Sequence, residues 1–160
     1  IILTNTLSSF PSALQMYILD LYLKEEAKDW AELFLGFKER GEKYESKELE
    51  AREASRIQNT QASLTLDDYV GVYEDKMYGK AIISMKEKHL HLVFEPAKEM
   101  FFSNMEHWHF DTFKVQFADP FLPAGYVTFS FDSKRNIEGF KIDLKSSDFH
   151  FFNLDFNKIE

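Results

Sequence analysis

Two histidines, a tryptophan and an aspartate stand close together in the chain, at His107, Trp108, His109 and Asp111. Imidazole and carboxylate groups transfer protons and bind zinc or iron, so this stretch is the part of the chain best equipped for chemistry. In an extended strand, alternate residues face the same side, which puts His107, His109 and Asp111 on one face and Trp108 on the other. We therefore take these four residues as the candidate ligand-binding or structural polar cluster.

The side toward which this face points depends on the strand that carries it. If Trp108 to Phe117 is one unbroken strand, both histidines and Asp111 point to the interior together with Phe113. If a bulge near Asp111 reverses the alternation, Trp108 points to the core and the polar groups point to solvent. The first arrangement favours a ligand pocket, the second favours a structural role, and the sequence leaves both open.

A metal site at His107, His109 and Asp111 is the less favoured alternative. Neighbouring positions of a single strand do not close a coordination shell, so the other histidines of the chain would have to come close. The sequence also contains neither a serine followed three residues later by lysine nor a Gly-x-Ser-x-Gly motif, which acyl-transfer enzymes use. We assign no catalytic residue, expect no cofactor, and expect hydrogen bonding rather than metal binding by the cluster.

The composition limits the classes of protein to which the chain can belong. Its 160 residues are 44% hydrophobic and 29% charged, as in a folded domain, either alone or with an appendage. The net charge of −8 argues against nucleic acid as a partner. With no cysteine there is neither a disulfide nor a thiolate zinc site, and no apolar run approaches the roughly 20 residues of a membrane span.

The N-terminal part predicts a short strand and a helix that need a partner. Ile1 to Thr4 reads as a buried strand, and Pro11 to Leu23 has apolar residues at helical spacing. A strand and one amphipathic helix cannot form a core by themselves. Because the chain also starts with Ile1 rather than methionine, we interpret it as a fragment of a longer polypeptide whose upstream part packs on this helix.

A second helix is expected after Asp29, which is a suitable N-cap. Gly36 and Gly41 are expected to interrupt this helix. Residues Lys38 to Arg56 alternate acidic and basic side chains at the spacing of stabilising helical pairs, which indicates a solvated linker helix. Gln58 to Ser63 is polar and ends this linker.

From Leu66 onward the pattern changes to short strands divided by turn residues, in a region that holds all but three of the 17 phenylalanines. The predicted strands are Gly71–Asp75, Lys80–Met85, His89–Phe94, Glu99–Ser103, Trp108–Phe117, Tyr126–Phe131, Ile137–Leu144 and Phe149–Phe156. The predicted fold class is α+β, mainly β: N-terminal helices followed by a small antiparallel barrel of about eight strands. A two-sheet sandwich is the alternative. Such a barrel is either filled by side chains or holds one small ligand.

Several stretches of the chain resemble a known combination of domains. They are Leu3-Thr4-Asn5-Thr6, Leu7 to Ala13, Tyr69 to Asp75, Tyr78-Gly79, His107 to Phe113, and Asp148 to Phe151. The first two resemble the last strand and C-terminal helix of beta-lactamase-related, penicillin-binding-protein-like serine hydrolases. The others resemble the C-terminal accessory domain of uncharacterised function that is attached to those hydrolases.

The resemblance implies a lipocalin-like barrel and an upstream serine hydrolase domain as the partner. It divides the chain into the end of a hydrolase domain (1–24), a charged helical linker (25–63) and a barrel (64–160). The catalytic motifs of the hydrolase have no counterpart here, so the chain is not expected to be an enzyme. An extracytoplasmic location, periplasmic or secreted, is implied by the resemblance alone.

The expected function is that of a non-catalytic accessory domain that shapes substrate access or assembly of the hydrolase. The alternative is an autonomous barrel that binds a small apolar or peptide-like ligand in its aromatic interior. A metal site at the histidine and aspartate cluster is the third and least favoured function.

Overall fold

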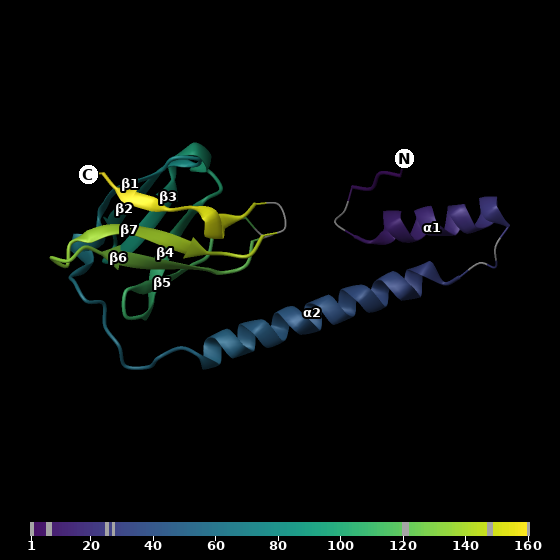
Figure 1. Ribbon diagram of the computed structural model, residues 1–160, viewed down its shortest axis with the longest axis horizontal. Helices are drawn as coiled ribbons and strands as arrows, with labels where there is room; N and C mark the ends of the chain where they lie inside the picture. The colour runs from purple at the N-terminus through teal and green to yellow at the C-terminus, as the bar shows by residue number, and fades with distance from the viewer. Residues whose placement is uncertain are drawn as a thin grey trace. The chain divides into compact units, whose positions relative to one another are not determined.

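The computed structural model describes residues 2–5, 8–24, 26, 28–119, 122–146 and 149–159. Ile1, Thr6, Leu7 and Asp148, which belong to stretches interpreted above, lie outside these ranges. The chain forms two compact units, Ile1–Ser55 and Arg56–Glu160, and each is described by itself (Figure 1). The division into residues 1–24, 25–63 and 64–160 stays a prediction.

The first unit is a pair of helices, α1 (Phe10–Leu23) and α2 (Trp30–Ala54). The indole Nε1 of Trp30 donates a hydrogen bond of 2.6 Å to the carboxylate of Asp20, which fastens the start of α2 to α1. The predicted cap is confirmed, because the carboxylate of Asp29 accepts the backbone N–H of Glu32 at 2.8 Å. Neither helix, within the described residues, is both long and apolar enough to cross a membrane.

Two expectations about this unit are wrong. Gly36 and Gly41 do not interrupt α2, since a glycine costs an exposed helix only about 1 kcal/mol relative to alanine. Ion pairs between residues one turn apart also stabilise the helix. In one such pair, Nζ of Lys38 lies 3.6 Å from Oε1 of Glu42. Residues 2–4, the described part of the predicted strand Ile1–Thr4, are not in a strand.

The second unit is a closed barrel of eight antiparallel strands in which each strand pairs with the next in sequence and the last with the first (Figure 1). The strands are β1 (Gly71–Asp75), β2 (Gly79–Lys86), β3 (His89–Phe94), β4 (Phe102–His109), β5 (Thr112–Val115), β6 (Gly125–Phe131), β7 (Ile137–Asp143) and β8 (Phe156–Lys158). Short 3₁₀ helices span Leu66–Tyr69, Glu95–Ala97 and Phe151–Asn153. The predicted mainly β fold with an eight-stranded barrel is confirmed, and the sandwich is excluded.

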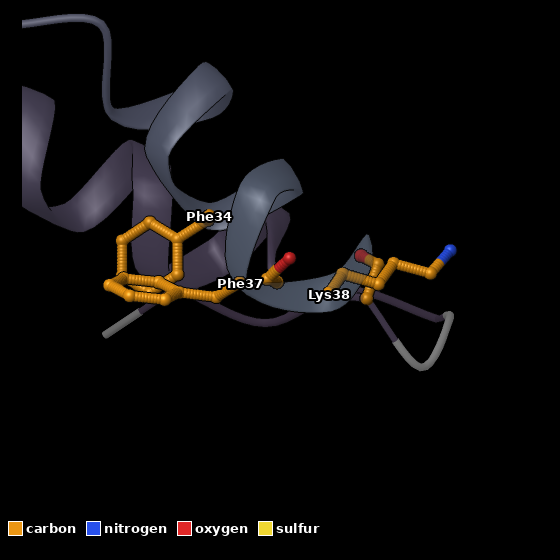
Figure 2. Close-up of a pocket in the computed structure, with 5 residues that line it drawn as sticks. Phe34, Phe37 and Lys38 are labelled. Atoms are coloured by element: carbon orange, nitrogen blue, oxygen red, sulfur yellow. The ribbon is translucent and has the colours of Figure 1, made fainter. Parts of the chain in front are cut away.

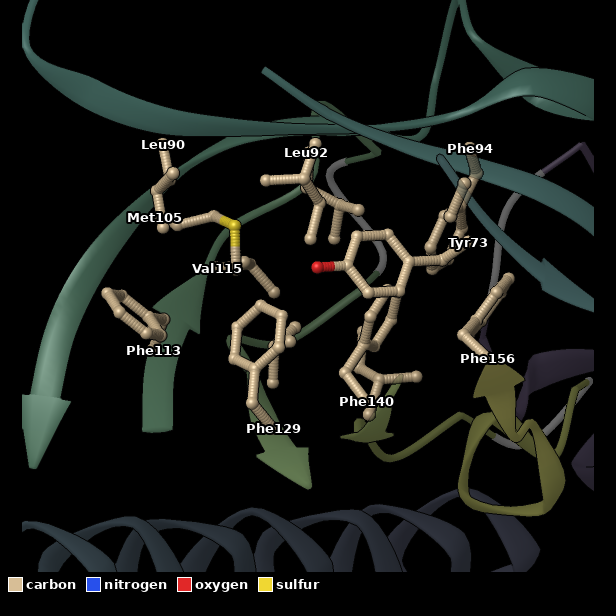
Figure 3. Close-up of a cluster of buried hydrophobic side chains, with 14 of the residues drawn as sticks. Tyr73, Leu90, Leu92, Phe94, Met105, Phe113, Val115, Phe129, Phe140 and Phe156 are labelled. Atoms are coloured by element: carbon tan, nitrogen blue, oxygen red, sulfur yellow. The ribbon is translucent and has the colours of Figure 1, made fainter. Parts of the chain in front are cut away.

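Large side chains fill the interior of the barrel (Figure 3). Alternate residues of each strand point inward, and their aromatic rings meet edge-on or stacked. The rings of Phe140 and Phe94 both stack on that of Phe156, with centroids 4.7 and 5.2 Å from it. The buried hydroxyl of Tyr73 donates to the backbone carbonyl of Tyr69 at 2.8 Å, so even this inward polar group is satisfied.

The barrel closes through β8, its shortest strand. Tyr73 pairs with Lys158 across the β1–β8 seam, and Ile159 donates its N–H to the carbonyl of Val72 at 2.8 Å. The carboxylate of Asp75 accepts the N–H of Asp155 at 2.8 Å and thereby fixes the chain just before β8. Burial raises the pKa of Asp75, but this bond and two further backbone hydrogen bonds outweigh burial and lower it overall.

Three predicted strands differ from the structure. Glu99 lies in a turn, because Phe94 and Phe101 are already joined by a 2.9 Å backbone bond that closes the connection to β4. The predicted strand Trp108–Phe117 is interrupted by a turn, described below. The predicted strand Phe149–Phe156 shares only its last residue with β8, since Asn153 and Leu154 donate to carbonyls three residues earlier in a 3₁₀ turn.

The close approach of β7 and β8 yields a first prediction. A Cβ on Gly139 would lie 2.1 Å from the carbonyl oxygen of Phe156, so Gly139→Ala must push β8 away from the barrel. We expect a loss of about 3 kcal/mol of unfolding free energy, measured by urea denaturation. Gly41→Ala, where a Cβ meets nothing within 4 Å, is the matched control and should leave barrel stability unchanged. A Gly139→Ala variant as stable as the wild type would contradict this account of closure.

Candidate functional site

The stretch from His107 to Phe113 forms the β4–β5 hairpin rather than one strand. β4 ends at His109, residues 110 and 111 make the turn, and β5 begins at Thr112. Phe110 has φ +45°, a left-handed conformation that is rare for a bulky residue. The pairing also shifts by a bulge between His107, opposite Phe113, and His109, opposite Thr112. Both a turn and a bulge therefore break the alternation on which the predicted common face depends.

The hairpin sends its four candidate side chains to different partners. His107 lies beside the inward ring of Phe113, 5.7 Å between centroids, and its Nε2 meets the carbonyl oxygen of Phe110 at 2.8 Å. Trp108 is 5% exposed yet lies outside the core cluster, with its ring 4.9 Å from that of Tyr126. Within the described residues no three histidine, aspartate or glutamate side chains are grouped so as to hold a metal ion.

The partners of the hairpin come from residues 56–63, which we call the strap. Arg56 donates from Nε to the carbonyl of Trp108 at 2.9 Å and from Nη2 to that of His107 at 3.2 Å. Its guanidinium also lies over the indole of Trp108, 4.7 Å from the ring centroid, in a cation–π contact. The N–H of Ile57 donates to Nδ1 of His109 at 3.3 Å. The start of the strap is thus fastened to the last residues of β4.

The end of the strap is held by the carboxylate of Asp111. Ser63 donates to Asp111 from both its N–H, at 2.8 Å, and its hydroxyl, at 2.7 Å, and the hydroxyl of Tyr69 donates to the same carboxylate. We call Ser63, Tyr69 and Asp111 the clasp. Between the two ends, Phe110 donates its N–H to the hydroxyl of Thr60 at 3.0 Å. Each of these hydrogen bonds ties one segment of this unit to another.

Electrostatics keep the clasp in one protonation state near neutral pH. Burial raises the pKa of Asp111, but the hydrogen bonds from Tyr69 and Ser63 and the charge of Arg135 outweigh burial and lower it. Burial, reinforced by the bond to Asp111, raises the pKa of Tyr69. The carboxylate thus stays ionised and the phenol stays protonated. Such a pair holds structure and has no acidic or basic group free for proton transfer.

Sequence reasoning found the hairpin residues but missed Arg56, Thr60, Ser63 and Tyr69. The polar composition of residues 58–63 predicted a linker, and the strap has this composition because it lies on the surface. Its partners are about 40 to 50 positions away in the chain, a distance at which a single sequence carries no pairing signal. The one local hint is the aspartate at position 111, because aspartate is typical of turns and binds backbone N–H groups there.

Two features define the class of this domain. The first is a closed barrel of consecutive antiparallel strands with side chains filling its interior, and the second is a strap that is fastened across one hairpin. Comparison with known families gives its identity: residues 55–158 match the family described as Domain of unknown function (DUF3471), and the chain belongs to this family. The matched region begins next to Arg56, the first residue of the strap. No curated protein sequence matches the chain.

Among solved structures, the chain is similar to the crystal structure of the C-terminal domain of penicillin binding protein Rv0907. The two share 20% sequence identity with a TM-score of 0.50, over 65% of this chain and 94% of that domain. At this identity the similarity shows a common fold. The predicted resemblance of the barrel to the C-terminal domain of penicillin-binding-protein-like proteins is confirmed, whereas the assignment of residues 1–24 to a hydrolase domain stays a prediction.

The clasp yields a second prediction. Asp111→Asn replaces an acceptor of three hydrogen bonds by a group that also donates, and we expect a loss of about 2 kcal/mol of unfolding free energy at pH 7. Glu87→Gln, the same loss of charge in the β2–β3 turn, is the matched control and should change stability by less than about 0.5 kcal/mol.

The pH dependence of the stability of the same variant tests whether the charge of the Asp111 carboxylate is the cause of this loss. Because folding lowers the pKa of Asp111, its contribution is present above the ordinary carboxyl pKa of about 3.9 and is lost as pH falls through the lower folded value. The difference between wild type and Asp111→Asn should therefore shrink in acid. Urea titrations at pH 7 and below pH 4 measure it, and a difference that is constant with pH would contradict the role of the carboxylate charge.

Proposed function

We propose that this chain is the non-catalytic accessory region of a beta-lactamase-related, penicillin-binding-protein-like serine hydrolase, and that it shapes substrate access or assembly of that enzyme. Membership of the family and the fold shared with a penicillin-binding-protein C-terminal domain support the context. The observation that carries the non-catalytic role is the clasp, in which the polar side chains that looked fit for chemistry bind other parts of the same domain.

The filled interior of the barrel supports a structural role for this domain more than a ligand-binding role. Phe94, Phe113, Phe140 and Phe156 are each at most 1% exposed and occupy the space in which a lipocalin-like pocket would lie (Figure 3). A small apolar or peptide-like ligand would have to displace these rings from close contacts. The ligand-binding alternative therefore has less support than the scaffold.

Helix α1 supports an apolar partner for the helical unit. Only Ala13 and Asp20 of this helix are buried, whereas the remainder of its surface is rich in exposed apolar side chains. These are Phe10, Tyr17, Ile18, Leu19, Leu21, Tyr22 and Leu23. A helix with apolar side chains over most of its surface is normally covered by another part of the protein. We propose that the upstream hydrolase domain of the same polypeptide covers it.

The helical unit also carries a surface depression that fits this proposal (Figure 2). It is lined by Ser8, Ser9, Phe34, Phe37 and Lys38. Figure 2 shows the rings of Phe34 and Phe37 lying together, with centroids 6.0 Å apart, while the Lys38 side chain extends away from them. An apolar floor with a polar rim is typical of a protein contact.

A third prediction concerns catalysis. The chain should neither hydrolyse a chromogenic cephalosporin nor become labelled by a fluorescent penicillin, because a serine activated by a neighbouring lysine is needed for acylation. Labelling is read on a denaturing gel beside an active penicillin-binding protein as the positive control. Stoichiometric labelling of this chain would overturn the non-catalytic role.

A fourth prediction concerns α1. The pair Ile18→Glu and Tyr22→Glu changes exposed side chains one turn apart, so the 160-residue chain should keep the melting temperature of its barrel. In the full-length hydrolase that we propose, the same pair should lower the melting temperature and the turnover, because two charges would be buried without partners. Gln15→Glu, at an exposed polar position of the same helix, is the matched control. An unchanged full-length enzyme would sink the proposed contact.

A further inference from the structure

The first contact of the strap depends on the protonation state of one histidine. Nδ1 of His109 accepts the N–H of Ile57, and a nitrogen that accepts a hydrogen bond carries no proton. The contact therefore requires the neutral imidazole with its proton on Nε2. The Arg56 guanidinium lies on the neighbouring Trp108, whose ring centroid is 6.3 Å from that of His109.

Protonation of His109 would weaken this contact in two ways. A proton on Nδ1 would face the N–H of Ile57, so that two donors meet where a donor met an acceptor. The new positive charge would also lie near the permanent charge of Arg56. The other titratable or charged groups of the surrounding elements are Glu106 and His107 of β4, Asp111 of the turn, Lys114 of β5 and Arg135 of the β6–β7 turn.

The carboxylates of Asp111 and Glu106 would favour the charged imidazole. That of Asp111 is already engaged by Ser63 and Tyr69, and Glu106 lies opposite Lys114 in the β4–β5 ladder. Lys114 lies over the same indole as Arg56, 5.5 Å from the ring centroid. Loss of the acceptor at Nδ1 is therefore the effect on which the contact depends.

We propose that residues 56–60 are a pH-sensitive latch, closed on the β4–β5 hairpin while His109 is neutral and released when His109 is protonated. The clasp stays closed during this change, because Asp111 remains ionised at about pH 5.5. Opening is then local: Arg56 leaves Trp108 and the first residues of the strap separate from the hairpin, while the barrel keeps its fold. This device is independent of the proposed accessory function.

Trp108 reports directly on the latch. In the full chain carrying Trp30→Phe, Trp108 is the sole tryptophan, and its side chain is 5% exposed with Arg56 in place. We expect a reversible red shift of its emission as pH is lowered from about 7.5 to about 5.5, the range in which histidines titrate. His109→Gln should abolish the shift, since its amide oxygen still accepts the Ile57 N–H but takes up no proton. His91→Gln, on the outer face of β3, is the matched control and should retain it.

Two further measurements separate the latch from general effects of acid. The Arg56→Ala variant should show the red-shifted emission at about pH 7.5 and at about pH 5.5, because the indole of Trp108 has lost its guanidinium cover at both. The amide resonance of Ile57 should lose its hydrogen-bonded shift in the acidic sample of the wild type, while that of Ser63 in the clasp should not change. A wild-type emission that does not change with pH, or an equal change in His109→Gln, would overturn the latch.

Discussion

The ionised carboxylate of Asp111 is the constraint on which this end of the barrel depends. A charge that is partly withdrawn from water must be surrounded by donors, or its burial costs several kcal/mol. Here the donors come from Ser63 in the strap and Tyr69 at the start of the barrel. The ring of Tyr69 in turn packs against Phe113 and Phe129, with centroids 5.3 and 4.8 Å away. Tyr69 therefore links the hydrogen bonds of the Asp111 carboxylate to the packing of the aromatic core.

This coupling explains how a stretch rich in reactive side chains serves a structural purpose. Imidazole, indole and carboxylate groups have strong, directional interactions, which are useful in catalysis and equally useful for fastening an irregular segment to a sheet. The strap has no strand partner of its own, so side chains and single N–H groups must replace the regular ladder. The composition of the hairpin meets that need with His109 and Asp111 as acceptors, and the hydroxyl of Thr60 in the strap accepts in return.

The parts of the fold that follow local periodicity were predictable from the sequence. Strands β3, β6 and β7 alternate apolar and polar residues, and β1 and β2 are separated by a turn with glycine. The predicted bounds of these five strands differ from the structure by at most one residue. The β4–β5 turn was missed because Phe110 occupies a left-handed position without the glycine or asparagine that usually marks one.

The start of β8 was missed for a different reason. The aromatic residues 149–154 have the composition of a strand, but they cover one end of the barrel in a 3₁₀ turn. Of the candidate site, the sequence predicted the residues on the hairpin and missed their partners in the strap. Residue types on the hairpin could be recognised, whereas the pairing of Arg56 with Trp108 or of Ser63 with Asp111 depends on tertiary contacts that no local pattern encodes.

The shortness of β8 has a consequence for the order in which the molecule can be made. Tyr73 of β1 pairs with Lys158, so the seam that completes the barrel joins segments separated by most of the domain. Until β8 has been synthesised, β1 and β7 lack the strand that pairs with their outer edges. Only when the short strand β8 arrives can these edges be joined. The barrel therefore cannot close before the last strand of the domain has been made, and unpaired edges of this kind are what chaperones protect and what aggregation uses.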